Sequence, residues 1–325
     1  MALRHHATDG EIAVIFAFAF GVMAVLVLGL LRWVHAWRGR GKIPRPLFWP
    51  VRDPALDRRL VRLLDLACFG GLLCIAYGSL IGPTHLEVTR IRLTSPKIKP
   101  ESGTIRLVHL SDLHSEKNPL NETRTAELVR GLRPDIVAIT GDFLNDEAGL
   151  PVARELIGAV KAPFGVFLVR GNMDIGMVAP DAFEGLDAVV LDKQARRLSI
   201  RGTPLRISGL SVGQEPYFDR FFSGLGARGD YEVFLFHYTD LAAKAAAAGA
   251  DLYLAGHTHG GQVRLPFYGA LVTLAKLGKR FEAGLYRLGG MALYVNRGLG
   301  MEGGSSLRVR FLCRPEITLL ELSAP

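Results

Sequence analysis

The chain has 325 residues, of which 49% are apolar, and a formal net charge of +8 at pH 7. This length allows one large domain or two ordinary ones, and the apolar content is sufficient to bury a sizeable core. The three cysteines, two of which lie inside one apolar run, exclude a disulfide framework and a zinc site built on cysteine. Residues 1–82 carry a net charge of +5, so that +3 remains for residues 83–325, which argues against a nucleic-acid-binding protein.

Two long apolar segments lie near the N-terminus. Residues 12–31 form a run of 20 without a charged side chain, and residues 63–81 form a run of 19 with a single acidic residue. Each run is long enough to cross a hydrocarbon core of about 30 Å as a helix. A secretory signal peptide is the alternative for the first run, but Arg32 and Trp33 follow it instead of a small-residue cleavage site. We therefore expect residues 1–82 to form a membrane anchor with two spans.

The segment between the two apolar runs is strongly basic. Residues 32–62 contain nine Lys or Arg against two Asp, and short basic loops stay on the cytoplasmic side of a membrane. If both runs span, everything after Pro83 lies outside the cytoplasm. If residues 63–81 only dip into the membrane surface, the C-terminal domain is cytoplasmic. The charge pattern favours the extracytoplasmic placement.

After the anchor, we expect residues 83–102 to form a strand and a connector leading into a domain of residues 103–325. Short β-rich apolar runs alternate in this domain with helical patterns. The predicted strands are 105–110, 136–140, 166–169, 205–210, 233–236, 252–255, 291–295 and 316–322. The predicted helices are 122–132, 152–160 and 239–248. This alternation is typical of a layered α/β domain in which sheets lie between helices.

Polar residues directly follow five of the predicted strands. In chain order they are Asp112, His114, Asp142, Asn172, His237, His257 and His259. The carboxyl ends of strands border the ligand crevice in open α/β sheets, so these side chains should point towards one rim. Oxygen and imidazole ligands together suit Mn, Fe or Zn. A single Asp or His after a strand is commonly a turn or packed residue, but five such strand ends in order indicate a metal site.

The motifs resemble those of the calcineurin-like metallophosphoesterase superfamily over about residues 103–323. They are Asp-x-His (112–114), Gly-Asp (141–142), Gly-Asn-x-Asp (171–174), a single His at 237 and Gly-His-x-His (256–259). Gly-His-Thr-His-Gly-Gly-Gln (256–262) and Asn-Arg-Gly-Leu-Gly (296–300) are similar to the membrane-associated bacterial branch. That branch includes small phosphodiesterases and UDP-2,3-diacylglucosamine pyrophosphohydrolases. The resemblance implies a four-layer α/β/β/α sandwich at the inner (cell) membrane of a bacterium.

The resemblance also implies two divalent cations, with Mn favoured over Fe or Zn. One would be held by Asp112, His114, Asp142 and His259. The other would be held by Asp142, Asn172, His237 and His257, so that Asp142 bridges them. Such a pair clamps a phosphoryl group, activates water and offsets charge on the leaving oxygen. Within this set we expect three residues to be catalytic: Asp142, Asn172 and His257.

Met173 stands where most of the superfamily has a His that is credited with protonating the leaving group. A thioether can neither donate nor accept a proton. Either the catalytic activity of the site is therefore weak, or its leaving group needs no general acid. A phosphate leaving group has a pKa near ~6, whereas an alkoxide behaves more like water, at about 15.7. Cleavage of a phosphate anhydride is therefore favoured. Because all seven metal ligands are present, we expect an active enzyme.

Several further segments are candidates for substrate contact. Arg170, Arg297 and Arg264 could bind phosphate through paired hydrogen bonds, with salt bridges as the alternative. Residues 266–277 form either a packed helix or a surface resting on a membrane. Residues 217–222 place aromatic side chains at helical spacing, which is typical of core packing.

The sequence therefore predicts a metal-dependent phosphodiesterase or pyrophosphohydrolase that acts on a lipid-linked or nucleotide-linked phosphate at a membrane. The specific alternative is the UDP-2,3-diacylglucosamine hydrolase of lipid A synthesis. That substrate is handled on the cytoplasmic face, in conflict with the placement favoured by the basic segment. A non-catalytic membrane protein that binds phosphate through its metals is the alternative from another class. A nucleic-acid partner is not expected.

Overall fold

The computed structural model describes residues 21–22, 24–31, 33–34, 37, 54–226, 229–302 and 308–325. Of the first predicted span, residues 12–31, the positions 21–22 and 24–31 are described, and they are helical. The rest of that run and most of the basic segment 32–62 lie outside the described residues. The two-span anchor therefore stays a prediction.

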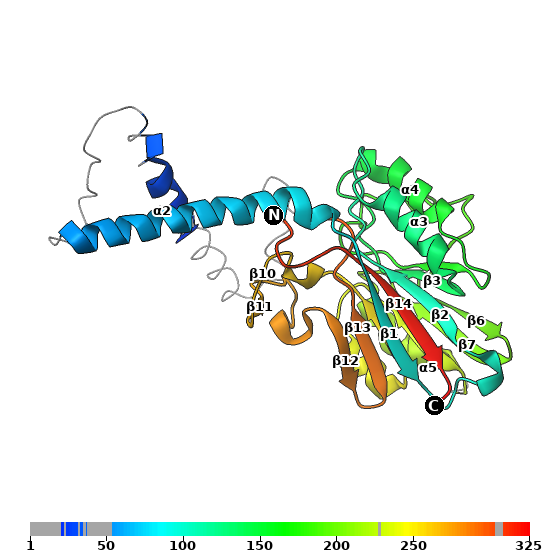
Figure 1. Ribbon diagram of the computed structural model, residues 1–325. Coiled ribbons are helices and arrows are strands. Elements are labelled where there is room, and N and C mark those ends of the chain that lie inside the picture. The colour runs from blue at the N-terminus through cyan, green and yellow to red at the C-terminus, as the bar shows by residue number, and fades with distance from the viewer. Residues whose placement is uncertain are drawn as a thin grey trace.

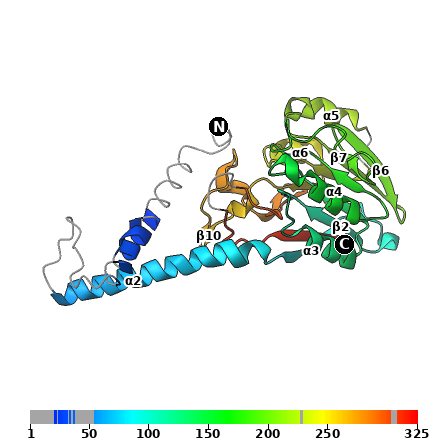
Figure 2. The same ribbon diagram turned by 90° about the horizontal axis from the view of Figure 1, so that it is seen from above.

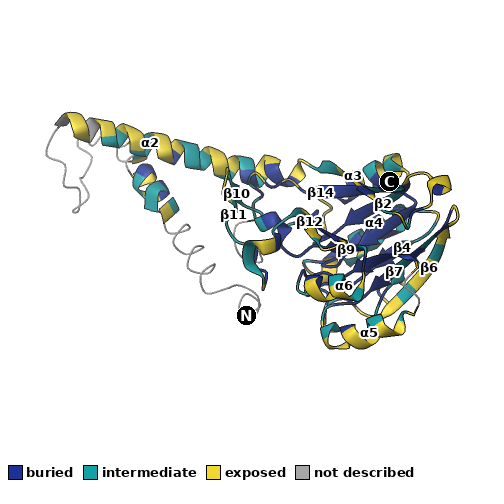
Figure 3. Ribbon diagram, turned by 90° about the horizontal axis from the view of Figure 1, so that it is seen from below, coloured by how far each residue is buried: buried dark blue, intermediate teal, exposed yellow. Residues whose placement is uncertain are grey.

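The second predicted span lies in a long helix that projects from the domain (Figure 1). The helix α2 (Pro54–Ala76) begins before residue 63 and continues through η2 (Tyr77–Ile81) and η3 (Gly82–Thr84). Among the described residues, the stretch Arg59–Thr84 alone is long and apolar enough to cross a membrane, and 6% of its most apolar window is buried. A core helix of a soluble protein can share this composition but would be covered, whereas Figure 3 shows α2 as mostly exposed or half-buried.

Two six-stranded sheets form the frame of the C-terminal domain. The first consists, in spatial order, of β1 (Glu87–Thr94), β14 (Glu316–Ser323), β2 (Ile105–Leu110), β3 (Ile136–Ile139), β4 (Val166–Leu168) and β5 (Val189–Val190). The second consists of β12 (Gly284–Leu288), β13 (Met291–Val295), β9 (Leu252–Ala255), β8 (Tyr231–Leu235), β7 (Thr203–Gly209) and β6 (Gln194–Ile200). Strands β2, β3 and β4 are parallel, as are β7, β8, β9 and β13. The carboxyl ends of each parallel set therefore share one edge.

The two sheets pack face to face, with helices on their outer faces (Figures 1 and 2). Leu107 of the first sheet and Leu235 of the second belong to one buried cluster between the sheets. The outer face of the first sheet is covered by α3 (Glu122–Leu132) and α4 (Leu150–Ala159). The outer face of the second is covered by α5 (Phe218–Gly224) and α6 (Ala242–Ala248). Each fully buried Leu, Val or Phe side chain stabilises this arrangement by about 1.5–3 kcal/mol. The expected mixed α/β fold of stacked sheets and helices is confirmed.

The predicted elements of the C-terminal domain are present with small shifts. All eight predicted strands occur, and the helix predicted over residues 122–132 is α3. It ends where Arg133 takes a left-handed conformation (φ 49°) before Pro134. The helix predicted over 239–248 is shorter, because residues 239–241 form a turn ahead of α6. Short 3-10 turns complete the domain: η4 (Pro100–Ser102), η5 (Glu147–Gly149), η6 (Glu215–Tyr217), η7 (His259–Gly261) and η8 (Gly278–Phe281).

The structure distinguishes the two apolar segments that the sequence offered as candidates for substrate contact. Residues 266–277 are not a packed helix: β10 (Arg264–Leu265) and β11 (Gly269–Ala270) form a short hairpin, and residues 271–277 are irregular. Left-handed backbone at Phe267 (φ 65°) and Leu274 (φ 53°) prevents a helix there. Residues 217–222 lie in η6 and α5: core packing is confirmed for Phe218, Phe221 and Phe222, whereas Tyr217 is exposed.

Candidate metal centre

The polar residues predicted from the strand ends come together in two groups. Among the described residues, the first group consists of Asp112, His114 and His259. The second consists of Asp142, His237 and His257. The candidate ligand atoms of each group lie within 4.8 Å of one another, and all six side chains are buried. The loops after β2, β3, β8 and β9 supply them, as expected from the parallel strand ends.

The Asp142 carboxylate lies between the two groups. Its Oδ2 atom is 3.2 Å from His237 Nε2 and 3.8 Å from His114 Nε2. In the first group, His114 Nε2 is 3.1 Å from His259 Nε2, which in turn is 3.4 Å from Asp112 Oδ1. Two nitrogens that share one metal at about 2.1 Å each stand about 3 Å apart when the angle between them is near 90°. The spacing of these imidazoles therefore fits a shared cation.

Asn172 carries a buried oxygen that lacks a partner. Its Oδ1 atom makes no hydrogen bond within the described part of the chain. Leaving a buried acceptor unsatisfied costs about 1–3 kcal/mol. The neighbouring Met173 N–H donates to Asp142 Oδ1 at 2.8 Å, which places this loop beside the Asp142 carboxylate. A cation bound beside this oxygen would satisfy it, and the two groups of oxygen and imidazole ligands fit a pair of divalent metals.

Hydrogen bonds from the imidazoles to neighbouring oxygens orient three of the four histidines. His114 Nδ1 lies 2.8 Å from Asn145 Oδ1, and His237 Nδ1 lies 2.6 Å from the Thr140 carbonyl oxygen. If these nitrogens carry the proton, the Nε2 lone pairs of both rings face the carboxylates. His257 has the opposite ring orientation, since its Nε2 rather than its Nδ1 contacts an oxygen, the Leu274 carbonyl at 3.3 Å. Such outer contacts fix the tautomer that a metal-binding imidazole needs.

The charged groups of the site shift one another's pKa values. Burial lowers the pKa of the His237 imidazole, but the carboxylates of Asp142 and Asp112 outweigh it and raise that pKa to about 10. Burial, then His114 and Arg310, holds the pKa of His259 well below its usual range, which favours the neutral ring that a metal ligand needs. Burial raises the pKa of the Asp112 carboxyl. The negative charge gathered here calls for cations, supplied either by protons or by metals.

The backbone around the ligands is strained. Asp112, His114, Asp142, His257 and His259 all have φ between 44° and 70°. Each non-glycine residue held there costs of order 1–3 kcal/mol, and such residues cluster at functional sites. Two hydrogen bonds hold the strained loops together: Asp112 N–H donates to the Gly141 carbonyl at 2.9 Å and His114 N–H to the Asp142 carbonyl at 3.0 Å. The framework thus supplies a fixed ligand geometry.

Two glycines permit the close approach of these loops. A Cβ atom on Gly171 would lie 2.1 Å from Asp142 Oδ1. A Cβ atom on Gly256 would lie 2.2 Å from Asp112 Oδ2. Both distances are far below van der Waals contact, so only glycine fits at either position.

Asp174 holds the second group together through the backbone. It is fully buried, and its Oδ2 atom accepts hydrogen bonds from the N–H groups of Asp142 (2.8 Å) and Gly171 (2.7 Å). Its Oδ1 atom accepts from Phe143 N–H at 2.8 Å. Burial, with a contribution from Asp142, raises the pKa of Asp174 to about 7. Asp174 is therefore a buried acceptor of backbone N–H groups rather than a solvent-exposed loop residue.

The three arginines predicted to meet phosphate are all engaged by carboxylates. Arg170 Nη1 lies 2.6 Å from Asp192 Oδ2. Arg297 Nη2 lies 3.1 Å from oxygens of Glu316 and of Glu87. Arg264 Nη2 lies 2.9 Å from Glu282 Oε1. A role in substrate binding would require each guanidinium to exchange or share its partner, and it stays a prediction.

Two residues near the site carry no recognisable sequence signal. The fully buried Arg310 donates to the carbonyl oxygens of Arg297 and Gly300, whose loop in turn donates two N–H groups to the Asp112 carbonyl. It thereby supports the backbone of the candidate ligand Asp112 from a distant part of the chain. Burial raises the pKa of the Glu302 carboxyl, which interacts electrostatically with His114 and Asp142. Neither residue belongs to a motif, so spacing could not have revealed them.

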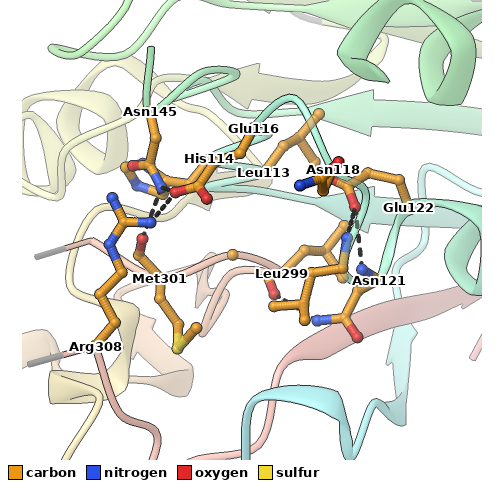
Figure 4. Close-up of a pocket in the computed structure, with 12 residues that line it drawn as sticks. Leu113, His114, Glu116, Asn118, Asn121, Glu122, Asn145, Leu299, Met301 and Arg308 are labelled. Atoms are coloured by element: carbon orange, nitrogen blue, oxygen red, sulfur yellow. Dashed lines mark hydrogen bonds and ion pairs between the residues drawn. The ribbon is translucent and has the colours of Figure 1, made fainter. Parts of the chain in front are cut away.

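A small cavity of about 50 Å³ opens beside His114 (Figure 4). Asn145, which holds the His114 ring, lines it, and an ion pair of Glu116 with Arg308 closes one side. On the other side Glu122 Oε2 accepts from the N–H groups of Leu120 and Asn121. The volume suits one or two waters rather than a ligand. The cavity lies next to the first group of candidate ligands, because His114 lines it.

Comparison with known proteins identifies the family. Residues 105–261 match the calcineurin-like phosphoesterase family. The chain is 46% identical over 254 residues to phosphodiesterase YaeI of Escherichia coli, covering 74% of this chain and 89% of that protein. It is 25% identical to the UDP-2,3-diacylglucosamine pyrophosphatase LpxG of Chlamydia trachomatis, covering 73% of this chain and 89% of LpxG.

A further relative is a bovine transmembrane protein with a metallophosphoesterase domain, which is 28% identical over 73% of this chain and 57% of that protein. The motifs, the strand-end clusters and these similarities agree on the same class of hydrolase. The chain belongs to the calcineurin-like metallophosphoesterase family.

Proposed function

We propose that this protein is a membrane-anchored phosphodiesterase or pyrophosphohydrolase that cleaves a lipid-linked or nucleotide-linked phosphate with two divalent metals. The observation that carries the proposal is the position of the Asp142 carboxylate between two buried groups of candidate ligands. A shared carboxylate sets the separation of two cations that must act on one phosphoryl group.

Each metal would be held by four residues. Asp112, His114, Asp142 and His259 would hold the first, and Asp142, Asn172, His237 and His257 the second, with Mn favoured over Fe or Zn. When bound, the metals would polarise the phosphoryl group and activate the attacking water. The unpaired Asn172 oxygen supports its inclusion. As a neutral ligand it holds a cation without cancelling its charge. Asp142, Asn172 and His257 are the residues that we assign to catalysis.

The leaving group is proposed to be one that needs no general acid. Met173 offers the centre only a backbone N–H, which is committed to Asp142 Oδ1. A phosphate leaving group, with a pKa near ~6, can depart unprotonated, whereas an alkoxide cannot easily do so. The relative named as a pyrophosphatase supports an anhydride substrate, while YaeI is named as a phosphodiesterase. UDP-2,3-diacylglucosamine is the specific candidate.

We propose that residues 1–82 anchor residues 103–325 to the bacterial cell membrane, with residues 83–102 as the connector. The exposed apolar stretch Arg59–Thr84 supports a span, and so does the relative named as a transmembrane protein. The basic segment between the predicted spans supports an extracytoplasmic domain. A UDP-linked substrate would require the cytoplasmic face instead.

The test is Mn²⁺-dependent hydrolysis of bis-p-nitrophenyl phosphate and of UDP-2,3-diacylglucosamine by the detergent-purified full chain. Asp142→Asn should lower both rates by about 10²-fold or more, because it weakens the shared ligand. Asp146→Asn is the matched control, since Asp146 is an exposed residue of the same loop. Release of UMP would support cleavage of a phosphate anhydride. Phosphate binding without turnover of either substrate would favour the non-catalytic alternative and contradict the proposal.

A further inference from the structure

The hairpin β10–β11 presents aromatic side chains to solvent at a strained turn. Phe267, at its tip, is fully exposed and has φ 65°, and Tyr268 is 53% exposed. Leu312, 48% exposed, lines the same shallow hollow as both rings. Single exposed apolar residues are normal. A group of them on a backbone conformation that costs free energy indicates a surface that is covered by something.

Hydrogen bonds and a ring contact connect this hairpin to the end of the apolar stretch Arg59–Thr84 through one strip of chain, residues 310–312. Arg310 N–H donates to the Gly78 carbonyl at 2.8 Å, and the rings of Phe311 and Tyr77 lie 5.9 Å apart. On the other side of the strip, Arg264 N–H donates to the Phe311 carbonyl at 2.9 Å. Figures 1, 2 and 3 agree in placing the hairpin beside α2, at the end of the domain from which this helix projects.

The charges around the hairpin suit anionic lipid headgroups. Lys279 Nζ lies 3.4 Å from the centre of the Tyr268 ring and 2.8 Å from the Tyr268 carbonyl oxygen. Lys276 and Arg280 nearby are exposed. The one acid of the hollow, Glu282, is already paired with Arg264 and with Ala270 N–H. Aromatic rings flanked by cations with long apolar stems are typical of the membrane–water interface.

The hairpin is also tied directly to the metal-binding loop. Arg264 Nη1 donates to the Gly260 carbonyl at 3.0 Å, and Thr258 Oγ1 donates to the Glu282 carbonyl at 2.7 Å. His257 Nε2 contacts the Leu274 carbonyl oxygen at 3.3 Å. Within the segment that would meet the bilayer, Arg264 therefore contacts the metal-binding loop directly, and the chain that follows the hairpin adds the contacts of Leu274 and Glu282.

We infer that the hairpin Arg264–Ala270, together with Leu312, rests in the headgroup layer of the bilayer that α2 enters. The docked hairpin holds the metal centre close to the membrane surface, so the substrate is a phosphate carried by a membrane lipid rather than a free nucleotide. This inference rests on the proposed function and on the proposed span, and it adds the surface through which the substrate arrives.

The test measures the membrane depth of the hairpin by tryptophan quenching. The three native tryptophans, Trp33, Trp37 and Trp49, are replaced by Phe in the full chain. Phe267→Trp or Leu312→Trp is then introduced, and the protein is reconstituted in phosphatidylglycerol-containing vesicles with or without lipids brominated near the headgroup. Tyr217→Trp is the matched control, because Tyr217 is 50% exposed and has Lys193 over its ring, yet it lies in η6 next to α5, away from α2 (Figure 3).

We expect brominated lipid to remove about half of the emission of the two hairpin variants and little of that of the control. Equal, weak quenching of all three would overturn the inference and leave the hairpin to a protein partner. Hydrolysis of bis-p-nitrophenyl phosphate by the wild-type protein is measured separately. Failure of that assay would count against the proposed function, whereas failure of the quenching alone would count against the docking surface.

Discussion

At the scale of single residues, the site depends on a few buried groups whose positions are fixed by hydrogen bonds. Asp142 contacts both ligand groups through its side chain, while its own N–H is held by Asp174 at 2.8 Å. Asp174 accepts three backbone N–H groups from the loops after β3 and β4 and so fixes their relative position. A misplacement of about 1 Å in such a site can cost ~10²-fold in rate. Precision at the centre therefore comes from residues that are not ligands.

We propose that Met173 limits the leaving groups that the site can release. Met173→His is expected to raise the rate on an alkyl phosphodiester by about 10²-fold, the usual contribution of a general acid, and to change anhydride hydrolysis little. The measurement is the ratio of the two rates for the variant and the wild-type protein. An unchanged ratio would show that the missing acid does not limit alkyl ester cleavage.

At the scale of the elements, most of the C-terminal fold was predictable because its strands are short β-rich apolar runs. Strands β3 and β9 are buried throughout and contain no charged residue, while β2 and β8 are mostly apolar and interrupted only by Arg106, His109 and Glu232. Strand β6 was not predicted, because it lies at the edge of its sheet and reads Gln-Ala-Arg-Arg-Leu-Ser-Ile with most side chains partly or fully exposed. The hairpin β10–β11 was not predicted either, because Phe267 and Tyr268 at its turn face solvent rather than a core.

The candidate ligands were predictable for a related reason. Parallel strands bring their carboxyl ends to one edge, so residues far apart in sequence meet there without any knowledge of side-chain contacts. The supporting role of Arg310 was not predictable, because it depends on a loop that returns to the site from the end of the chain.

The close approach of the strand-end loops can be tested by replacing one glycine in these loops and, as a control, one glycine in a helix. Gly171→Ala places a Cβ atom 2.1 Å from Asp142 Oδ1 and must displace one loop. We expect about a 10²-fold loss of activity and weaker Mn²⁺ binding, measured by titration of the metal-free protein. Gly131→Ala in α3 is the control, since its Cβ would meet nothing within 4 Å, and it should be neutral or slightly stabilising. Equal activity of the two variants would show that the loops are not held as closely as described.

At the scale of the whole molecule, a domain with a buried candidate metal site is joined to the helix α2, which is mostly exposed or half-buried in the described part of the chain. The hydrogen bond between Arg310 N–H and the Gly78 carbonyl connects the end of that helix to the domain. The same strip of chain connects it to the hairpin next to the metal-binding loop. The end of the stretch Arg59–Thr84 is therefore joined to the domain by direct hydrogen bonds.

The side of the membrane on which the domain lies is a property of the whole chain. The charge of residues 32–62 predicts that alkaline phosphatase fused after Ser323 will be active in cells, because the enzyme matures only outside the cytoplasm. A fusion to a cytoplasmic reporter at the same position serves as the control and should be inactive. The opposite pattern would place the domain in the cytoplasm and remove the conflict with a UDP-linked substrate.

The central claim is that two metals share the Asp142 carboxylate and are both needed for hydrolysis. The most direct test removes metal from the purified full chain with a chelator and adds Mn²⁺ back while bound metal and hydrolysis of bis-p-nitrophenyl phosphate are measured together. We predict no activity without metal, and full activity at about two Mn²⁺ per chain. Full activity in the presence of the chelator, or with a single bound metal, would contradict the account.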